Sequence, residues 1–128
     1  MKNLEDLKIA YYTGDLNDPL GNIRIFNLTP HDLNVVTEDG SVETLPRSGL
    51  IARVKQIDKL DGAIGLINIT KREFGEVEDL PEPVDSVYFI VSSLVASAAK
   101  GRDDLLVPGQ LVRNDQGQVV GCKGLARV

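Results

Sequence analysis

Two serines, Ser92 and Ser93, stand between an apolar run at 87–91 and an expected short helix. Serine hydroxyls and the free backbone N–H groups of a helix N-terminus can bind an anion, because the helix dipole is positive there. Arg102 follows the helix and could neutralise such an anion. The alternative is that serine simply caps the helix and that Arg102 pairs with Asp103 at the surface.

A second polar group follows the strand expected at 23–28, where Pro30 separates Thr29 from His31. Binding residues are often placed at the ends of strands. Histidine can hydrogen-bond a ligand there, or act as a general acid or base near neutral pH. The alternative is that Thr29 or Asp32 caps a turn and that His31 is an ordinary loop residue.

A third polar group surrounds Gly49, with Ser48 before it and Arg53 four residues after it. Glycine lets a ligand approach the backbone closely, and arginine pairs with phosphate or carboxylate through two hydrogen bonds. The spacing is not that of a known phosphate-binding loop, and the alternative is a tight turn before an amphipathic strand. Together the three groups make up the candidate ligand-binding residues Thr29, His31, Ser48, Arg53, Ser92, Ser93 and Arg102.

Catalysis has less support than binding. His31 is the only histidine, and no serine lies in a Gly-x-Ser-x-Gly elbow. One histidine and one cysteine with scattered carboxylates do not make a metal site, and Cys122 is expected to be buried and inert. We therefore predict no catalytic residue, no metal and no cofactor, and we keep a hydrolase with His31 as base as an alternative.

The elements that must position these residues are mostly β-strands. Alternating or apolar runs bounded by turn residues predict strands, and Asp39-Gly40 predicts a tight hairpin turn. Gly101 predicts the end of a helix that runs to about Lys100, and Leu94, Val95 and Ala98 are expected to form its inward face. The fold expected is α+β and mostly β, a small antiparallel or mixed sandwich or barrel with one main helix. The expected strands are 23–28, 33–37, 42–45, 50–57, 64–72, 87–91, 111–113, 118–122 and 125–128, with a turn at 61–62.

Residues 1–22 differ from the rest of the chain. They hold a short amphipathic piece and then a stretch at 14–22 that is dense in turn residues, so a loop is expected there. We predict an N-terminal arm at 1–22, lying on its own domain or on a neighbouring subunit, and a single mostly-β domain at 23–128.

Composition and charge exclude several classes of function. The net charge of −5 argues against binding to a nucleic-acid polymer, which needs a clustered basic surface. No apolar run has the length of a membrane span and no signal peptide is expected, while a single cysteine suits a reducing compartment. A cytoplasmic protein that does not bind membranes is therefore expected. The acidic stretch 73–85 is predicted to be a solvated, proline-broken loop.

Several motifs together resemble a group of small, uncharacterised proteins of bacteriophages and prophages. They lie at 27–32, 47–54, 88–92, 102–109 and 113–122, and the first is Asn-Leu-Thr-Pro-His-Asp. The resemblance covers about residues 23–125. It implies a viral or mobile-element origin and expression in a bacterial cytoplasm, where small accessory phage proteins often inhibit host defence and some sequester nucleotide signals.

These observations lead to one main expectation about function and two alternatives. The main one is a non-enzymatic protein that binds a small anionic, nucleotide-like ligand, with inhibition of bacterial defence by sequestration as the role that a phage origin suggests. A homo-oligomer is expected, because small β domains have free sheet edges and few large cavities, so the pocket could lie between subunits. The alternatives are a module that binds a host protein through 73–85 or the N-terminal arm, and the small hydrolase.

Overall fold

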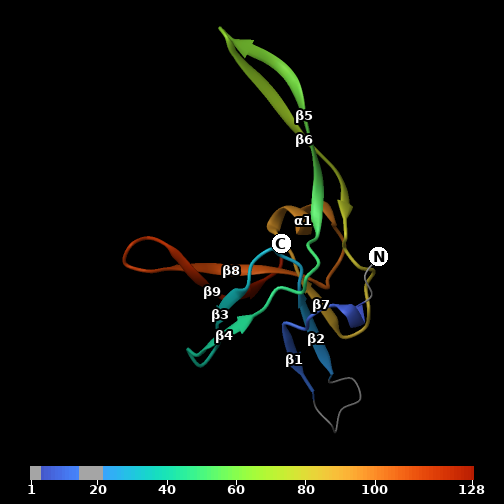
Figure 1. Ribbon diagram of the computed structural model, residues 1–128, viewed down its shortest axis with the longest axis vertical. Coiled ribbons are helices and arrows are strands. Elements are labelled where there is room, and N and C mark those ends of the chain that lie inside the picture. The colour runs from blue at the N-terminus through green and yellow to red at the C-terminus, as the bar shows by residue number, and fades with distance from the viewer. Residues whose placement is uncertain (1–3, 15–21) are drawn as a thin grey trace.

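The computed structural model describes residues 4–14 and 22–128, and most of these residues lie in β-strands (Figure 1). Seven strands form one mixed sheet in the order β1-β2-β7-β8-β9-β3-β4, and β5 and β6 form a separate two-stranded ribbon. The elements are η1 (Leu4–Asp6), β1 (Tyr11–Thr13), β2 (Ile23–Asn27), β3 (Leu33–Val36), β4 (Val42–Leu45), β5 (Arg53–Ile64), β6 (Ile67–Glu78), β7 (Val87–Ile90), α1 (Ser93–Ala98), β8 (Leu105–Arg113) and β9 (Val119–Ala126).

The sheet is nearly closed on itself. Immediately after β4, Arg47 makes a parallel bridge with Asn27 at the end of β2, and the backbone N–H of Ser48 donates to the Asn27 carbonyl at 2.9 Å. These contacts bring the last strand of the sheet back to its second strand. The prediction of a mostly β fold with a mixed, barrel-like sheet and one helix is confirmed.

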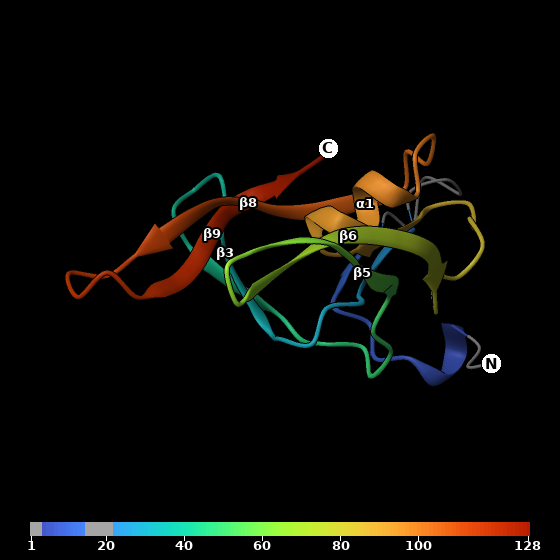
Figure 2. The ribbon, with the colours of Figure 1, turned by 90° about the horizontal axis from the view of Figure 1, so that it is seen from above.

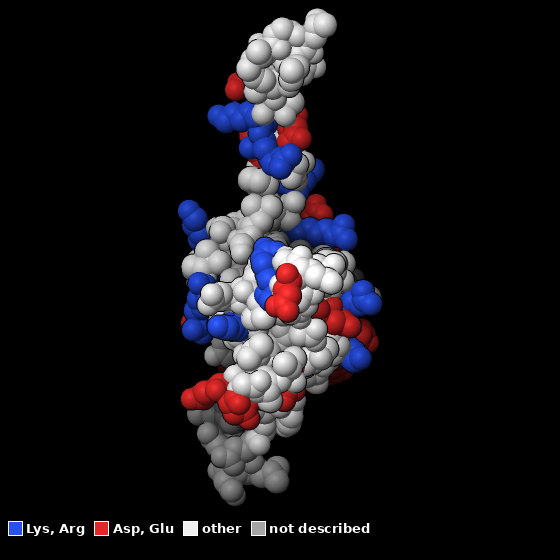
Figure 3. Space-filling view, turned by 90° about the vertical axis from the view of Figure 1, so that its left-hand side faces the viewer, with Lys and Arg blue, Asp and Glu red and all other residues white. Residues whose placement is uncertain are grey.

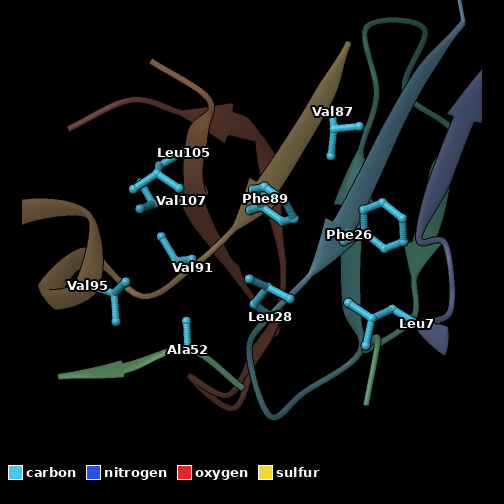
Figure 4. Packing of buried hydrophobic residues seen from close by; sticks show 10 residues of the cluster. All are labelled: Leu7, Phe26, Leu28, Ala52, Val87, Phe89, Val91, Val95, Leu105 and Val107. Carbon is cyan, nitrogen blue, oxygen red and sulfur yellow. The ribbon is translucent and has the colours of Figure 1, made fainter. Parts of the chain in front are cut away.

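Strand β7 lies at the centre of the fold, as its uninterrupted apolar sequence predicted. It pairs in parallel with β2 on one side and with β8 on the other. Phe89, Ile90 and Val91 are fully buried. The main core cluster, shown in Figure 4, consists of Leu7, Phe26, Leu28, Ala52, Val87, Phe89, Val91, Val95, Leu105 and Val107.

Helix α1 begins after its cap Ser92, as predicted, but it ends at Ala98 with Ala99 as its C-cap, before the end expected at Lys100 and Gly101. The prediction of its inward face is also wrong in part. Val95 is buried and packs on the core with Ala96 and Ala99, whereas Leu94 and Ala98, which were expected to point inward, are exposed. The helix has only six residues and lies beside β5, β6 and β8 (Figure 2). A helix this short can bury only a narrow stripe against its neighbours.

The ribbon differs most from expectation. The turn lies at Gly65-Leu66, where Gly65 has a φ of +59°, and not at Asp61-Gly62. Asp61 falls at a β-bulge between Leu60 and Gly62, so a sequence typical of a turn continues the strand instead. The acidic stretch 73–85 was predicted to be a loop, which is wrong for its first half, since residues up to Glu78 belong to β6.

The described N-terminal residues also pack on the sheet. Leu7 belongs to the core, the N–H of Ala10 donates to the Ile25 carbonyl at 2.8 Å, and β1 pairs with β2. The described part of the N-terminal arm therefore lies on its own chain, while most of the loop expected at 14–22 lies outside the described residues. The separate strand expected at 125–128 is wrong, since Leu125 and Ala126 are the end of β9 and Arg127 and Val128 lie outside the strands. Within the two described ranges, no helix is long and apolar enough to cross a membrane.

Candidate functional site

The three polar groups singled out in the sequence belong to chain segments that lie side by side. The N–H of Leu28 donates to the carbonyl of Ile90 at 2.8 Å, and the N–H of Ala52 donates to the carbonyl of Leu28 at 3.0 Å. The N–H of Ser48 reaches Asn27 in the same way. The turn after β2, the segment that follows β4 and the end of β7 are therefore adjacent.

The hydroxyls in this region are used by the fold. Thr29 Oγ1 lies 2.6 Å from Asn27 Oδ1 and 3.0 Å from the carbonyl oxygen of His31, and it can donate to either. Ser48 Oγ accepts from the N–H of Leu50 and donates to its carbonyl, both at 3.2 Å. Because Thr29 and Ser48 are buried, these bonds satisfy groups that water cannot reach.

The helix N-terminus and Arg102 are also occupied. Ser92 Oγ accepts from the N–H of Val95 at 3.3 Å, which is the bond of a helix cap. Arg102 donates twice to Asp104, the second bond joining Nη2 and Oδ2 at 2.6 Å, and Nη1 donates to the Pro81 carbonyl at 2.9 Å. The alternative expected from the sequence, a surface pair of Arg102 with Asp103, is wrong in its partner. Arg102 pairs with Asp104, and the side chains of Arg102 and Asp104 are both largely buried.

The remaining two candidates lie elsewhere. Ser93 is the exposed first residue of α1. Arg53 is the exposed first residue of β5 and lies opposite Glu78 across the ribbon. Neither belongs to the lining of a cavity that lies between the segment 31–34 and strands β8 and β9.

Asn27 organises this region, and the sequence analysis did not single it out as a functional residue. Its fully buried Nδ2 donates to the carbonyls of His31 at 2.8 Å and Leu45 at 3.0 Å, while Oδ1 accepts from the N–H and hydroxyl of Thr29. The amide thus ties β2 to the end of β4 and shapes the turn that carries His31. Its signal in the sequence is a polar side chain at the end of an apolar strand.

A cavity of about 350 Å³ opens beside His31. The segment 31–34 forms one wall, and β8 and β9 contribute the other. Its polar lining residues are His31, Asp32 and Asn34, and its apolar lining includes Pro108, Leu111, Val119 and Val120. Cys122 also lines it, but its side chain packs in the core with Val35, Leu45 and Ile90, as its expected burial implied.

Two of the three polar lining residues are held by neighbours. Asp32 Oδ1 accepts from the N–H of Arg47 at 2.9 Å and lies 3.6 Å from its Nε. Asn34 Oδ1 accepts from Thr44 Oγ1 at 2.8 Å. The imidazole of His31 makes no hydrogen bond to the part of the chain that the structure describes. Of the seven predicted residues, His31 is therefore the one whose side chain is both at a cavity and available to a ligand.

A second cavity, of about 270 Å³, suits an anion less well. It lies beside β1, β3 and β4, and its lining holds two carboxylates, Glu38 and Glu43, whereas the lining beside His31 holds one, Asp32; neither lining includes a lysine or arginine. The described residues hold no group of three or more histidine, cysteine or acidic side chains arranged to bind a metal ion.

Comparison of the chain with protein-family models, with curated proteins and with solved structures finds no match. We therefore infer a function from the geometry of the cavity beside His31.

Proposed function

We propose that this chain is a non-enzymatic binding protein that takes a small anionic, nucleotide-like molecule into the cavity beside His31. The observation that carries the proposal is the pairing of an available imidazole with an apolar wall in one cavity. The volume lies within the range of about 300–1,000 Å³ that is usual for small-molecule sites. A flat ring can lie against the apolar side chains while His31 hydrogen-bonds a polar edge or a phosphate.

Arg47 supplies a positive charge next to this cavity. Its ion pair with Asp32 is exposed, since 64% of the arginine and 52% of the aspartate side chain remain accessible. Such a pair contributes at most about 1 kcal/mol, and the hydrogen bond from Arg47 Nη1 to the Pro30 carbonyl is exposed and long, at 3.3 Å. The guanidinium can therefore turn toward a phosphate at little cost. This arrangement replaces Arg53 and Arg102, the two arginines expected from the sequence to neutralise the ligand.

The resemblance to small phage and prophage proteins suggests the biological setting. In that setting the protein would act in a bacterial cytoplasm and would sequester a nucleotide signal of host defence. Binding without turnover is sufficient for this role. The proposed site accordingly uses hydrogen-bonding and charged groups but no nucleophile.

Thermal unfolding with a panel of linear and cyclic nucleotides tests this proposal. A ligand at one hundred times its Kd stabilises the native state by about 2.7 kcal/mol, which raises the melting temperature by several degrees. His31→Ala and Arg47→Ala should each reduce the shift, whereas Arg72→Ala should keep it, because Arg72 is an exposed arginine that pairs with Asp58 on the β5–β6 ribbon, away from the cavity (Figure 1). A melting temperature that no nucleotide of the panel changes would contradict the proposal. Release of a modified nucleotide would favour the hydrolase.

A further inference from the structure

The β5–β6 ribbon extends away from the rest of the molecule (Figure 1). Its two strands have 12 residues each, and nearly all of them are exposed. An isolated two-stranded hairpin is only marginally stable in water. The length and isolation of this ribbon therefore indicate that it is covered by another molecule when the protein functions.

The end of the ribbon is apolar. Leu66 at the turn is fully exposed, and Ile64 and Ile67 beside it are each 70% exposed. Figure 3 shows an uncharged end, with lysine, arginine and acidic side chains lower on the ribbon. Clusters of exposed apolar side chains mark interaction surfaces. The large apolar side chains exposed on the ribbon are Ile57, Leu60, Ile64, Leu66, Ile67, Ile69 and Phe74.

Four of these side chains share one face of the ribbon. Ile64 pairs with Ile67 across the strands, and Ile69 follows two residues later on the same face, because side chains alternate along a strand. Ile57 lies opposite Glu73 and so also belongs to this face. We call the face made by Ile57, Ile64, Ile67 and Ile69 the isoleucine face.

The charge of the ribbon points to the identity of its partner. Residues 53–78 carry five basic and five acidic side chains, whereas the rest of the chain carries nine basic and fourteen acidic ones. The net charge of −5 therefore lies entirely outside the ribbon. Two copies of an acidic chain repel each other least where they meet through a neutral segment, and a surface of anionic lipids would instead select an excess of basic residues.

Each face of the ribbon carries an ion pair. Lys59 Nζ lies 3.1 Å from Glu73 Oε2 on the isoleucine face, and Arg72 Nε lies 3.3 Å from Asp58 Oδ1 on the other face. Each face therefore presents both signs of charge to an identical face.

We propose that the β5–β6 ribbon is the surface through which this protein associates with a second copy of itself. The isoleucine face of one copy packs on the same face of the other around a two-fold axis, so the contacts that each copy makes are identical. This assigns the expected homo-oligomer to a particular surface. It does not depend on the ligand proposed for the cavity beside His31.

Light scattering coupled to size-exclusion chromatography tests the proposal on the full chain. The wild type should have at least twice the 13.9 kDa chain mass, and Ile64→Thr with Ile67→Thr should give monomers, since threonine keeps the β-branched shape without the apolar surface. The matched control, Val42→Thr with Val84→Thr, changes exposed valines outside the ribbon and should keep the wild-type mass. A monomeric wild type at about 100 μM, or an unchanged mass in the ribbon variant, would overturn it.

Amide hydrogen exchange tests self-association through the ribbon on the wild-type protein, without any substitution. Amides of 57–74 should become more protected as the protein concentration rises from about 1 to 100 μM, because association covers the ribbon by mass action. Amides of β7 should not change, since they are already in the core. Ribbon amides that exchange equally fast at both concentrations would contradict self-association, and protection that appears only with anionic vesicles would show a membrane partner instead.

Discussion

Arg102 and Asp104 are joined by two hydrogen bonds, with Nε donating to Oδ1 at 2.9 Å and Nη2 donating to Oδ2 at 2.6 Å. The guanidinium also lies 6.0 Å from the centre of the Phe89 ring. This pair connects the segment after α1 to the central strand and to the proline-rich connection at Pro81. Its geometry stabilises the fold and uses three of the five guanidinium N–H groups in bonds within the chain.

Removing this arginine should destabilise the protein without affecting ligand binding. The Arg102 and Asp104 side chains are only 19% and 10% accessible, so Arg102→Ala leaves a buried carboxylate without its partner. We expect a loss of about 3 kcal/mol in the free energy of unfolding, measured by urea denaturation. Arg102→Lys should recover part of it, because lysine keeps the charge but not the two parallel bonds.

The control for this variant is Arg113→Ala. Arg113 is exposed and donates to the Gly117 carbonyl, so its loss should change the free energy of unfolding by less than about 0.5 kcal/mol. If Arg102→Ala unfolded at the wild-type urea concentration but bound nucleotides more weakly, Arg102 would be a ligand residue after all.

Asn27→Ala should be among the most destabilising single changes in this chain. It removes the amide donor to the buried carbonyl of Leu45, one of the donors to the His31 carbonyl, and the buried acceptor for the N–H and hydroxyl of Thr29. Each unsatisfied buried group costs about 1–3 kcal/mol, so we expect a loss of at least about 3 kcal/mol in chemical unfolding. Thr29→Ser keeps the hydroxyl and should cost much less, and equal effects from the two changes would show that the amide is not the centre of this network.

The central strand and the hairpins were predictable because their signals are local. An uninterrupted apolar run at 87–91 can be covered only in the interior, and the glycine of Asp39-Gly40 supplies the positive φ that its turn requires. The position of the turn in the β5–β6 ribbon was not predictable in this way. Asp61-Gly62 and Gly65-Leu66 are both plausible turns, and the cross-strand register selects the second.

The candidate site was less predictable than the fold, because the partners of its polar groups come from distant segments. The sequence shows that Arg102 is an arginine after a helix, but not that Asp104 and the Pro81 carbonyl occupy its donors. In the same way, the role of Asn27 depends on a bond to Leu45, 18 residues away. Of the seven predicted residues, His31 is the one that lines the cavity with an available side chain, because its turn places it beside β8 and β9.

Gly121 should not tolerate a side chain. A Cβ atom at this position would lie 2.6 Å from the carbonyl oxygen of Asn34, where β9 runs beside β3. Gly121→Ala must therefore push the two strands apart, and we expect a loss of about 1–3 kcal/mol in thermal or chemical unfolding.

Gly75 provides the matched control for this change. A Cβ atom there would meet Lys55 Cβ at 3.5 Å, which is an ordinary contact. Gly75→Ala should therefore leave the free energy of unfolding within about 0.5 kcal/mol of the wild type. Equal losses for the two variants would mean that the close approach of β9 to β3 is not the cause.

Asp39 should make the stability of the β3–β4 hairpin depend on pH in the acidic range. Hydrogen bonds from the side chains of Ser41 and Thr37 and from the Ser41 N–H lower the pKa of Asp39 from 3.8 to about 2. A lowered pKa means that the folded state prefers the carboxylate, so the stabilisation is complete above about pH 4 and is lost as the pH falls toward 2. Amide exchange of residues 37–41 should report this loss.

Asp39→Asn is the comparison for this titration. The hairpin of the variant should open more readily than that of the wild type at about pH 6, and the difference should shrink between about pH 4 and pH 2. A difference that stays constant over this range would contradict the proposed role of the carboxylate.

The most direct test of the binding site is a titration of ¹⁵N-labelled protein with the nucleotide that gives the largest thermal shift, followed by two-dimensional NMR. The proposal predicts that the largest amide shifts occur at residues 31–34 and 119–121, on the two walls of the cavity beside His31. Amides of 92–95, at the start of α1, should hardly move. Shifts concentrated at the helix start and at Arg102 would contradict the proposal and would show that the ligand binds at Ser92 and Ser93 instead.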